Sequence, residues 1–129
     1  MSIPSDRSYT KDHEWARLEG GRVRVGITDH AQDQLGSVVY LDLTPVGSAV
    51  KAGDVLAEIE STKAVSQVYA PVAGVVAEIN ASLVDHPGRV NDDPYGEGWI
   101  SLLEAAGASL DRLLDPAAYE ERLREEEAP

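Results

Sequence analysis

Lys63 lies between two strand-like runs in the stretch AEIESTKAVSQVYAP, residues 57–71. The short link STKA predicts a tight turn between paired strands, and such a turn keeps a side chain in water on a rigid support. This position suits a lysine that another enzyme must find and modify. The simpler interpretation is a solubilising turn lysine, so the residue type alone does not decide between the two.

Other residue patterns give weaker indications of chemistry. His13-Glu14 could begin a zinc-protease motif, but Arg17 stands where the second histidine is required. Asp92-Asp93 in NDDPYGEG could suggest a cation loop, yet the spacing fails the calcium-loop template and a turn built from Asp-Pro and glycines explains it. The three histidines have no ligand spacing, so the sequence predicts no metal site. Asp85-His86 near Ser82 could suggest a hydrolase, but they fall in a Pro/Gly loop without a nucleophile elbow, so no catalytic residue is predicted.

Composition narrows the function classes. The chain has 129 residues, 43% of them hydrophobic, which predicts one globular domain over residues 1–129. The 23 acidic residues outnumber 11 Lys and Arg, and the formal net charge of -12 disfavours nucleic acid and favours docking on basic patches of proteins. Because there is no cysteine, any thiol chemistry must come from an attached group.

The sequence shows no sign of a membrane segment. No apolar run approaches the ~20 residues of a membrane span. The stretch MSIPSDRSYTKDHEW has no targeting pattern. We therefore expect a cytoplasmic protein with no membrane partner, and we expect a monomer.

The elements that must position Lys63 are mostly strands. Residues 13–19 and 22–28 flank Gly20-Gly21, which predicts a β-hairpin. Residues 28–36 predict a helix of about two turns that is capped by Thr28 and ended by Gly36. Residues 82–98 are rich in turn formers and are expected to form a loop. Further strands are expected at residues 37–43, 55–60, 64–70, 75–79 and 99–104.

The C-terminal part changes to helical periodicity. Leu110, Leu113 and Leu114 have helical spacing, and Asp115-Pro116 predicts a cap followed by a restart. We expect a broken helical segment at about residues 108–126, packed on a sheet core at about residues 8–104.

A short internal sequence similarity suggests two related β units. VLAEIESTKA at residues 55–64 and VVAEINASLV at residues 75–84 align with an offset of twenty, which a pseudo-two-fold axis or chance would explain. The predicted fold is mainly β, with two small sheets around an aliphatic core, short helices and a C-terminal helix. The residues expected in the core are Val55, Ala57, Ile59, Val68, Val76 and Ile79.

Five stretches occur in a characteristic order over roughly residues 8 to 103: YTKDHEW, VGITDHAQDQLG, EIESTKAVSQVYAPVAG, VAEIN and VNDDPYGEGWI. With these stretches the chain resembles the glycine cleavage system H-protein family, a lipoyl-carrying branch of the biotinyl/lipoyl-domain superfamily. HEW alone is weak, whereas the lysine segment together with NDDPYGEGW is highly specific. The resemblance implies a barrel-sandwich hybrid fold in which Lys63 carries lipoate in amide linkage.

The neighbours of Lys63 distinguish related carriers. Thr62 and Ala64 flank it, whereas biotin carriers usually have methionine on both sides and lipoyl domains of 2-oxo acid dehydrogenases usually have aspartate before the lysine. Gln67 and Ser37 stand where the family often has acids, and the proline of LTPVG is displaced by one position. These departures leave the lysine unaffected and weaken only a role for an acid at position 67.

A family member acts as a shuttle and not as an enzyme. The resemblance implies that lipoyl-Lys63 accepts an aminomethyl group from a pyridoxal-phosphate glycine decarboxylase and presents it to a folate-dependent aminomethyltransferase. Dihydrolipoamide dehydrogenase would reoxidise the arm, and lipoate-attachment enzymes would load it. Tethering gives the group a high effective concentration at each docked active site.

Three further residues are candidates for roles around the arm. Glu60, three residues before Lys63, is expected to contribute to recognition for lipoylation. Glu14 and His30 are expected to line a cleft for the loaded arm, because a buried cationic amine needs an acceptor or a carboxylate. The simpler interpretations are an exposed strand acid for Glu14 and a surface histidine without a role for His30.

Three other classes stay open at this point. A lipoyl or biotin domain of another multienzyme complex would differ in its attached group and in its partner. A hydrolase or metalloenzyme would show turnover or bound metal without lysine modification. A lipoate-relay protein on the same fold would be lipoylated yet inactive in glycine cleavage.

Overall fold

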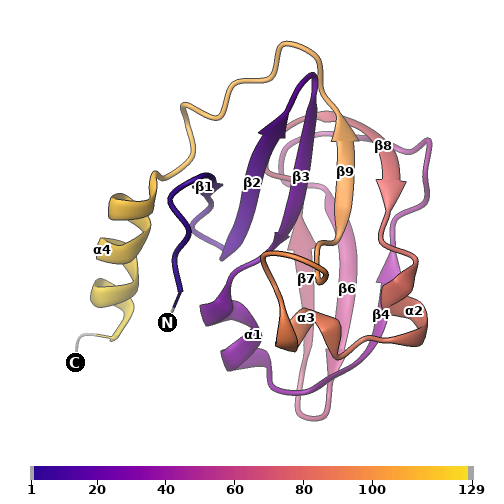
Figure 1. The fold of residues 1–129 in the computed structure, drawn as a ribbon, viewed down its shortest axis with the longest axis vertical. Helices are drawn as coiled ribbons and strands as arrows, with labels where there is room; N and C mark the ends of the chain where they lie inside the picture. Colours follow the sequence, from indigo (N-terminus) through magenta and orange to yellow (C-terminus); the bar gives the residue numbers. More distant parts are fainter. Residues whose placement is uncertain (1, 128–129) are drawn as a thin grey trace.

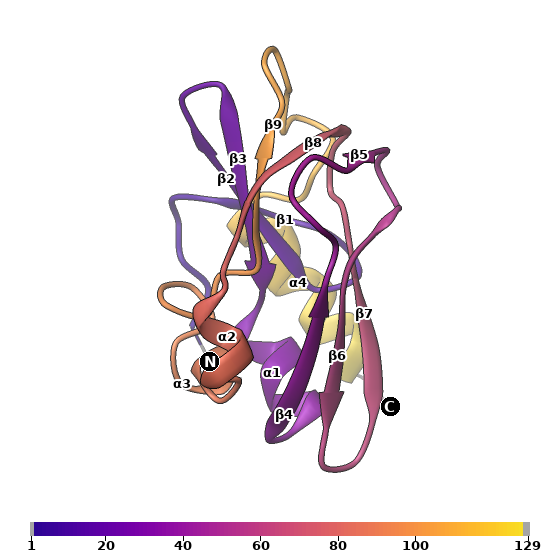
Figure 2. The same ribbon diagram turned by 90° about the vertical axis from the view of Figure 1, so that its right-hand side faces the viewer.

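Two antiparallel sheets form the framework of residues 2–127, the part of the chain that the computed structural model describes (Figure 1). Figure 2 shows the smaller sheet as a separate layer beside the strands of the larger one. This mainly β architecture with short helices confirms the predicted fold class. The larger sheet has the order β1 (Ser8–Tyr9), β2 (Glu14–Glu19), β3 (Arg22–Ile27), β9 (Ser101–Glu104), β8 (Gly74–Ile79) and β5 (Ala49–Val50). The smaller sheet has the order β4 (Val38–Leu43), β6 (Val55–Ser61) and β7 (Val65–Tyr69).

The predicted hairpin around Gly20 is present as β2–β3. Its register places Glu14 opposite Ile27 and Glu19 opposite Arg22. Gly20 has a φ of 66°, in the left-handed region that glycine adopts without a steric penalty. The hairpin fixes the start of β2, where Glu14 lies, beside the end of β3, from which the first helix follows.

The helix predicted after β3 is α1 (Asp29–Leu35). The Oγ1 of Thr28 accepts a hydrogen bond from the backbone N–H of Ala31 at 3.2 Å, as expected of a cap. The prediction of a loop over residues 82–98 was wrong in part, because two single-turn helices form there, α2 (Ser82–Asp85) and α3 (Arg89–Asp92). The fully buried side chains of Leu83 and Val90 anchor them, which a composition rich in turn residues did not indicate.

The C-terminal helix α4 comprises Pro116–Glu127, and the prediction of helical structure before it was wrong. Residues 110–115 form turns, and Leu114 makes an isolated bridge to Tyr9, with backbone N···O distances of 2.7 and 2.8 Å. The helical spacing of the leucines therefore reflects their contacts with the sheet. No helix within residues 2–127 has the length and apolar character needed to cross a membrane.

The predicted core is largely correct. Val55 was predicted wrongly, since 38% of it is exposed, and Ile79 is only partly buried. The pairing of β6 with β7 shifts register between Val55 and Ala57, so that Leu56 and Ala57 are both buried and the alternation assumed for this strand breaks. The other predicted core residues are at most 2% exposed: Ala57, Ile59, Val68 and Val76.

An aromatic cluster attaches α4 to the larger sheet. The rings of Tyr9 and Tyr119 are stacked with their centroids 4.6 Å apart, and both residues are fully buried. Trp15 and Leu123 complete the buried part of this cluster. Tyr119 fixes the first part of α4 to the sheet. The last turn of the helix lies beyond this contact and extends toward α1.

Candidate functional site

Lys63 lies in the exposed turn between β6 and β7, the hairpin tip at the lower end of Figure 2. The last strand pair before the turn is Glu60 with Val65. The Oγ of Ser61 accepts hydrogen bonds from the backbone N–H groups of Ala64 at 3.0 Å and of Lys63 at 3.3 Å. The predicted hairpin is therefore present, and one serine side chain organises its tip.

The end of α1 supports the hairpin from the side. The backbone N–H of Thr62 donates to the carbonyl of Ser37 at 3.0 Å. Gly36 has a φ of 81°, and a Cβ placed there would lie 3.1 Å from the Cε of Lys63. Glycine at position 36 thus meets two requirements, a left-handed backbone and room for the lysine stem.

Asn91 of α3 holds the segment that supports the hairpin. Its Nδ2 donates to the carbonyl of Gly36 at 2.8 Å and to the Oε1 of Gln32 at 3.1 Å. Its Oδ1 accepts from the backbone N–H of Val38 at 2.9 Å. Sequence reasoning gave no role to Asn91, although it lies within VNDDPYGEGWI, because no local spacing relates position 91 to positions 36–38.

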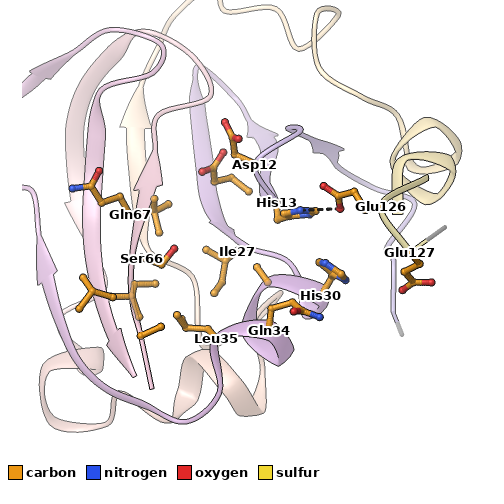
Figure 3. A pocket seen from close by; sticks show the side chains of 16 residues that line it. Asp12, His13, Ile27, His30, Gln34, Leu35, Ser66, Gln67, Glu126 and Glu127 are labelled. Atoms are coloured by element: carbon orange, nitrogen blue, oxygen red, sulfur yellow. Dashed lines mark ion pairs between the residues drawn. The ribbon is translucent and has the colours of Figure 1, made fainter. Parts of the chain in front are cut away.

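A cavity of about 670 Å³ opens beside the hairpin (Figure 3). Its wall includes Ala64 and Val65, the two residues that follow Lys63, so the cavity begins next to the lysine. Glu14 and His30, which the sequence suggested for a cleft, both line it. Apolar side chains form another part of its lining: Ile27, Leu35, Ile59 and Val68.

Glu14 is buried and joins the two sheets. Only 2% of it is exposed, so the interpretation as an exposed strand acid is wrong. Its carboxylate accepts hydrogen bonds from the hydroxyl of Thr10 and from the backbone N–H of Tyr69, the latter at 3.1 Å. Burial raises the pKa of Glu14 above 4.5, and the two hydrogen bonds act against that rise.

His30 and His13 lie together across the cavity from Ser66 and Gln67 of the hairpin (Figure 3). Their ring centroids are 4.6 Å apart, and the Nδ1 of His30 is buried without a hydrogen-bond partner among the described residues. The Nδ1 of His13 lies 2.9 Å from the hydroxyl of Tyr119, and its Nε2 lies 3.2 Å from the carboxylate of Glu126. Burial lowers the pKa of His13.

The sequence gave no spacing that related these histidines to each other. His13 immediately precedes β2, and His30 is in the first turn of α1. The β2–β3 hairpin brings the two positions together, with the backbone N–H of Thr28 donating to the carbonyl of His13 at 3.0 Å. His13 also has a φ of 69°, a conformation that histidine adopts more often than most residues.

Glu60 and Gln67 lie on the two strands of the hairpin. Glu60 is half-buried and pairs through its backbone with Tyr40 and Val65. Gln67 is exposed at the cavity wall, and its Oε1 accepts a hydrogen bond from the hydroxyl of Tyr69 at 3.2 Å. The carboxylates of the cavity therefore come from other residues, Glu14 among them.

Two small sheets with a lysine at the exposed tip of a hairpin define the lipoyl/biotinyl class of carrier folds. Residues 7–126 match the family described as glycine cleavage H-protein. The glycine cleavage system H protein of Rubrobacter xylanophilus is 54% identical over 125 residues, 97% of this chain and 98% of that protein. That of Thermus thermophilus is 54% identical over 127 residues, 98% and 99% of the two chains. A crystal structure of a glycine cleavage system H protein from Mycobacterium marinum matches with a TM-score of 0.84 and 42% identity, covering 95% of this chain and 99% of that one.

The chain belongs to the glycine cleavage H-protein family, which confirms the resemblance seen in the sequence. Proteins of this family are carrier components and not catalysts. The chain is accordingly a lipoyl carrier of the glycine cleavage system.

Proposed function

We propose that Lys63 carries lipoate in amide linkage and that the loaded chain moves an aminomethyl group between enzymes. The observation that carries this proposal is the exposed position of Lys63 on a turn fixed by Ser61 and Ser37, beside a cavity. The residues fit the group, because Gly36 leaves room for the lysine stem and the turn leaves the amine accessible. Acylation would remove the charge of Lys63 and leave a long, mobile tether.

The partners follow from the chemistry that the attached group supplies. When bound, lipoate would supply a redox-active dithiolane. Lys63 would present this group for loading at glycine decarboxylase, for unloading at the aminomethyltransferase and for reoxidation of the resulting dithiol by dihydrolipoamide dehydrogenase. The chain itself has no cysteine, and its net charge of -12 suits docking on basic patches of these enzymes. We place this shuttle in the cytoplasm and propose that it acts as a monomer.

The residues around the arm receive separate roles in this proposal. Glu14 offers a buried carboxylate at the cavity wall, which can pair with the cationic amine of the loaded arm. His30 lines the same cavity, across from the hairpin. Glu60, at the base of the turn, contributes to recognition by the enzyme that attaches lipoate.

The direct test is the intact mass of the folded chain after incubation with lipoate and a lipoate ligase, followed by peptide mapping. The wild-type chain should gain one lipoyl group, located on Lys63. Lys63→Arg keeps the positive charge and should gain none, whereas Lys51→Arg, in another exposed turn, should be modified like the wild type. Folded wild-type protein that gains no mass beside a competent ligase control would contradict the proposal.

A second measurement separates the shuttle from a lipoate-relay protein. The lipoylated chain is mixed with purified glycine decarboxylase, aminomethyltransferase and dihydrolipoamide dehydrogenase in the presence of tetrahydrofolate as the one-carbon acceptor, and glycine-dependent reduction of NAD is followed. A carrier should support the full reaction, and the Lys63→Arg chain should not. A lipoylated chain that supports no reaction would assign it to lipoate relay.

A further inference from the structure

We propose that His13, His30 and Glu126 form a binding site for a divalent transition-metal cation such as Zn²⁺ at the cavity. Each residue offers one donor atom, and the three atoms lie within 4.8 Å of one another. The donors come from the turn before β2, from α1 and from the last turn of α4. Figure 3 shows the His30 ring next to the ion pair of His13 and Glu126.

The donor set matches the ligand chemistry of zinc. Two imidazoles and one carboxylate are the protein ligands of a class of zinc sites that keep the fourth position open. The Nε2 of His13 and the carboxylate of Glu126 are 3.2 Å apart. This is close to the roughly 3.3 Å between donors of a tetrahedral ion bound at about 2.0–2.1 Å. The donor atom of His30 lies within 4.8 Å of the other two, and movement of its side chain toward them would complete the set.

Two independent features of the histidines support metal binding. His30 is 9% exposed, and its Nδ1 is buried without a partner among the described residues, a cost that native structures normally avoid. The Nδ1 of His13 contacts the hydroxyl of Tyr119, which is also 2.7 Å from the Oγ1 of Thr28. Metal-binding histidines are typically oriented in this way through their second ring nitrogen.

The charge of the cavity favours a cation. Asp12, Glu14 and Glu127 line it together with Glu126, and its described lining includes no Lys or Arg. Lys11 and Arg122 line the adjoining depression with His13 and oppose a bound cation from that side. The four carboxylates of the cavity outnumber these two basic side chains, so the local field attracts a divalent ion.

Metal binding would connect three segments of the chain. It would fix the last turn of α4 against α1 and against the turn before β2. The proposed ligands are side chains of this chain alone, and none is Lys63. The site therefore does not depend on lipoylation.

The test is calorimetric titration of the untagged, unlipoylated full chain with Zn²⁺, together with the visible absorption of bound Co²⁺. The wild type should bind one ion per chain and give the intense bands of tetrahedral Co²⁺. Glu126→Gln, at the exposed end of α4, and His30→Gln should each weaken binding tenfold or more. Glu125→Gln and His86→Gln, the matched controls, lie outside the cavity lining and should bind like the wild type.

Equal Zn²⁺ affinity in the Glu126→Gln chain and the wild type would overturn the proposal, because the ion would then be held by the acidic surface in general. Absence of saturable binding to the wild type would overturn it as well. Circular dichroism establishes that each variant is folded before titration. Since the measurement is metal binding, its failure would leave the proposed carrier function untouched.

Discussion

Glu14 is the residue at which burial and charge oppose each other most directly. The residue is 2% exposed, and its carboxyl group faces Thr10 and the backbone of Tyr69. A carboxylate in this position costs desolvation free energy that two hydrogen bonds offset only in part, and its raised pKa expresses that balance. Buried acids with shifted pKa values cluster at functional sites, which is in keeping with the role proposed for Glu14.

Glu14→Gln should remove this cost, with a pH dependence whose sign follows from the raised pKa. Below its ordinary pKa of 4.5 the carboxyl is protonated in both states. As the pH rises, the unfolded chain ionises first, so the wild type loses stability relative to the variant until the folded pKa is passed. Urea unfolding between about pH 4 and pH 7 should show that the free energy of unfolding of the variant, relative to that of the wild type, increases as the pH rises.

A difference between the two chains that does not change with pH would contradict the raised pKa of Glu14. Glu97→Gln, at an exposed position, is the control and should show no comparable trend. In the loaded carrier the same Glu14→Gln change should shorten the half-life of the aminomethyl group, because the carboxylate that pairs with the cationic amine is lost. An unchanged half-life would remove Glu14 from the proposed path of the arm.

Glu60→Ala should slow attachment of lipoate several-fold while leaving the free energy of unfolding within about 0.5 kcal/mol. The reason is that Glu60 is half-buried at the base of the turn and would be read by the attaching enzyme. Glu58→Ala, two residues earlier on β6, is the matched control. Equal initial rates of lipoylation for both variants and the wild type would exclude this role of Glu60.

At the residue scale, sequence reasoning could predict the turn that holds Lys63 because its signal is local: two strand patterns and the short link between them. It assigned lipoate to Lys63 only through the family resemblance. It could place Glu14 and His30 near the arm only through the family resemblance. The contact of His13 with Glu126 crosses 113 positions of the chain, and that of Asn91 with Gly36 crosses 55. No periodicity reports such pairs, because they depend on how the sheets and helices pack.

At the element scale, α3 holds the link between α1 and β4 by hydrogen bonds, and this link in turn holds the β6–β7 turn. Asn91 satisfies the backbone of Gly36 and Val38, and Ser37 between them accepts from Thr62. The single-turn helix α3 has a structural role near Lys63, because it carries Asn91. The position of the turn therefore depends on a side chain 28 residues beyond Lys63.

Asn91→Ala should destabilise the chain by about 1–3 kcal/mol, because a backbone N–H and a backbone carbonyl lose their partner. Lipoylation of Lys63 should also slow, since the link under the hairpin is loosened. Urea unfolding and the initial rate of ligase-catalysed modification measure the two effects. Asp92→Ala, at the next and exposed position of α3, should change neither the free energy of unfolding nor the rate of modification. An Asn91→Ala chain as stable as the wild type would mean that the α1–β4 link does not need the hydrogen bonds of Asn91.

Elements with strong local signals were predicted correctly, and those built from single turns were not. The β2–β3 hairpin has its glycine turn, and α1 has a capping threonine and a terminal glycine. The helices α2 and α3 are four residues each, too short for any periodicity to appear. At residues 110–115 a helix was predicted where turns are found. The leucines there have helical spacing, but this spacing comes from their packing against the core.

At the scale of the whole molecule, α4 joins the aromatic core to the cavity. Tyr119 stacks on Tyr9, while Glu126, two turns further on, pairs with His13. The helix has mostly exposed charged residues elsewhere, so these contacts decide where it lies. One helix thus depends on the sheet at one end and forms part of the cavity wall at the other.

Tyr119→Ala should lower the free energy of unfolding by about 3 kcal/mol, because a fully buried ring and its contact with Tyr9 are removed. The hydroxyl contacts of Thr28 and His13 are lost with it. Urea unfolding followed by circular dichroism measures the change. Glu125→Ala, on the exposed face of the same helix, is the control, and a similarly small loss in both chains would show that α4 is not coupled to the core.

The strand that leads to Lys63 is shared by both halves of the molecule. Leu56 of β6 belongs to the core cluster of the larger sheet, whereas Ala57 and Ile59 belong to that of the smaller sheet. Substitutions in either core therefore act on the same short strand. In evolutionary terms, neither sheet can be exchanged between relatives without the other. A chain recombined from two relatives would keep Lys63 in place only if β6 and the residues of both core clusters came from the same parent.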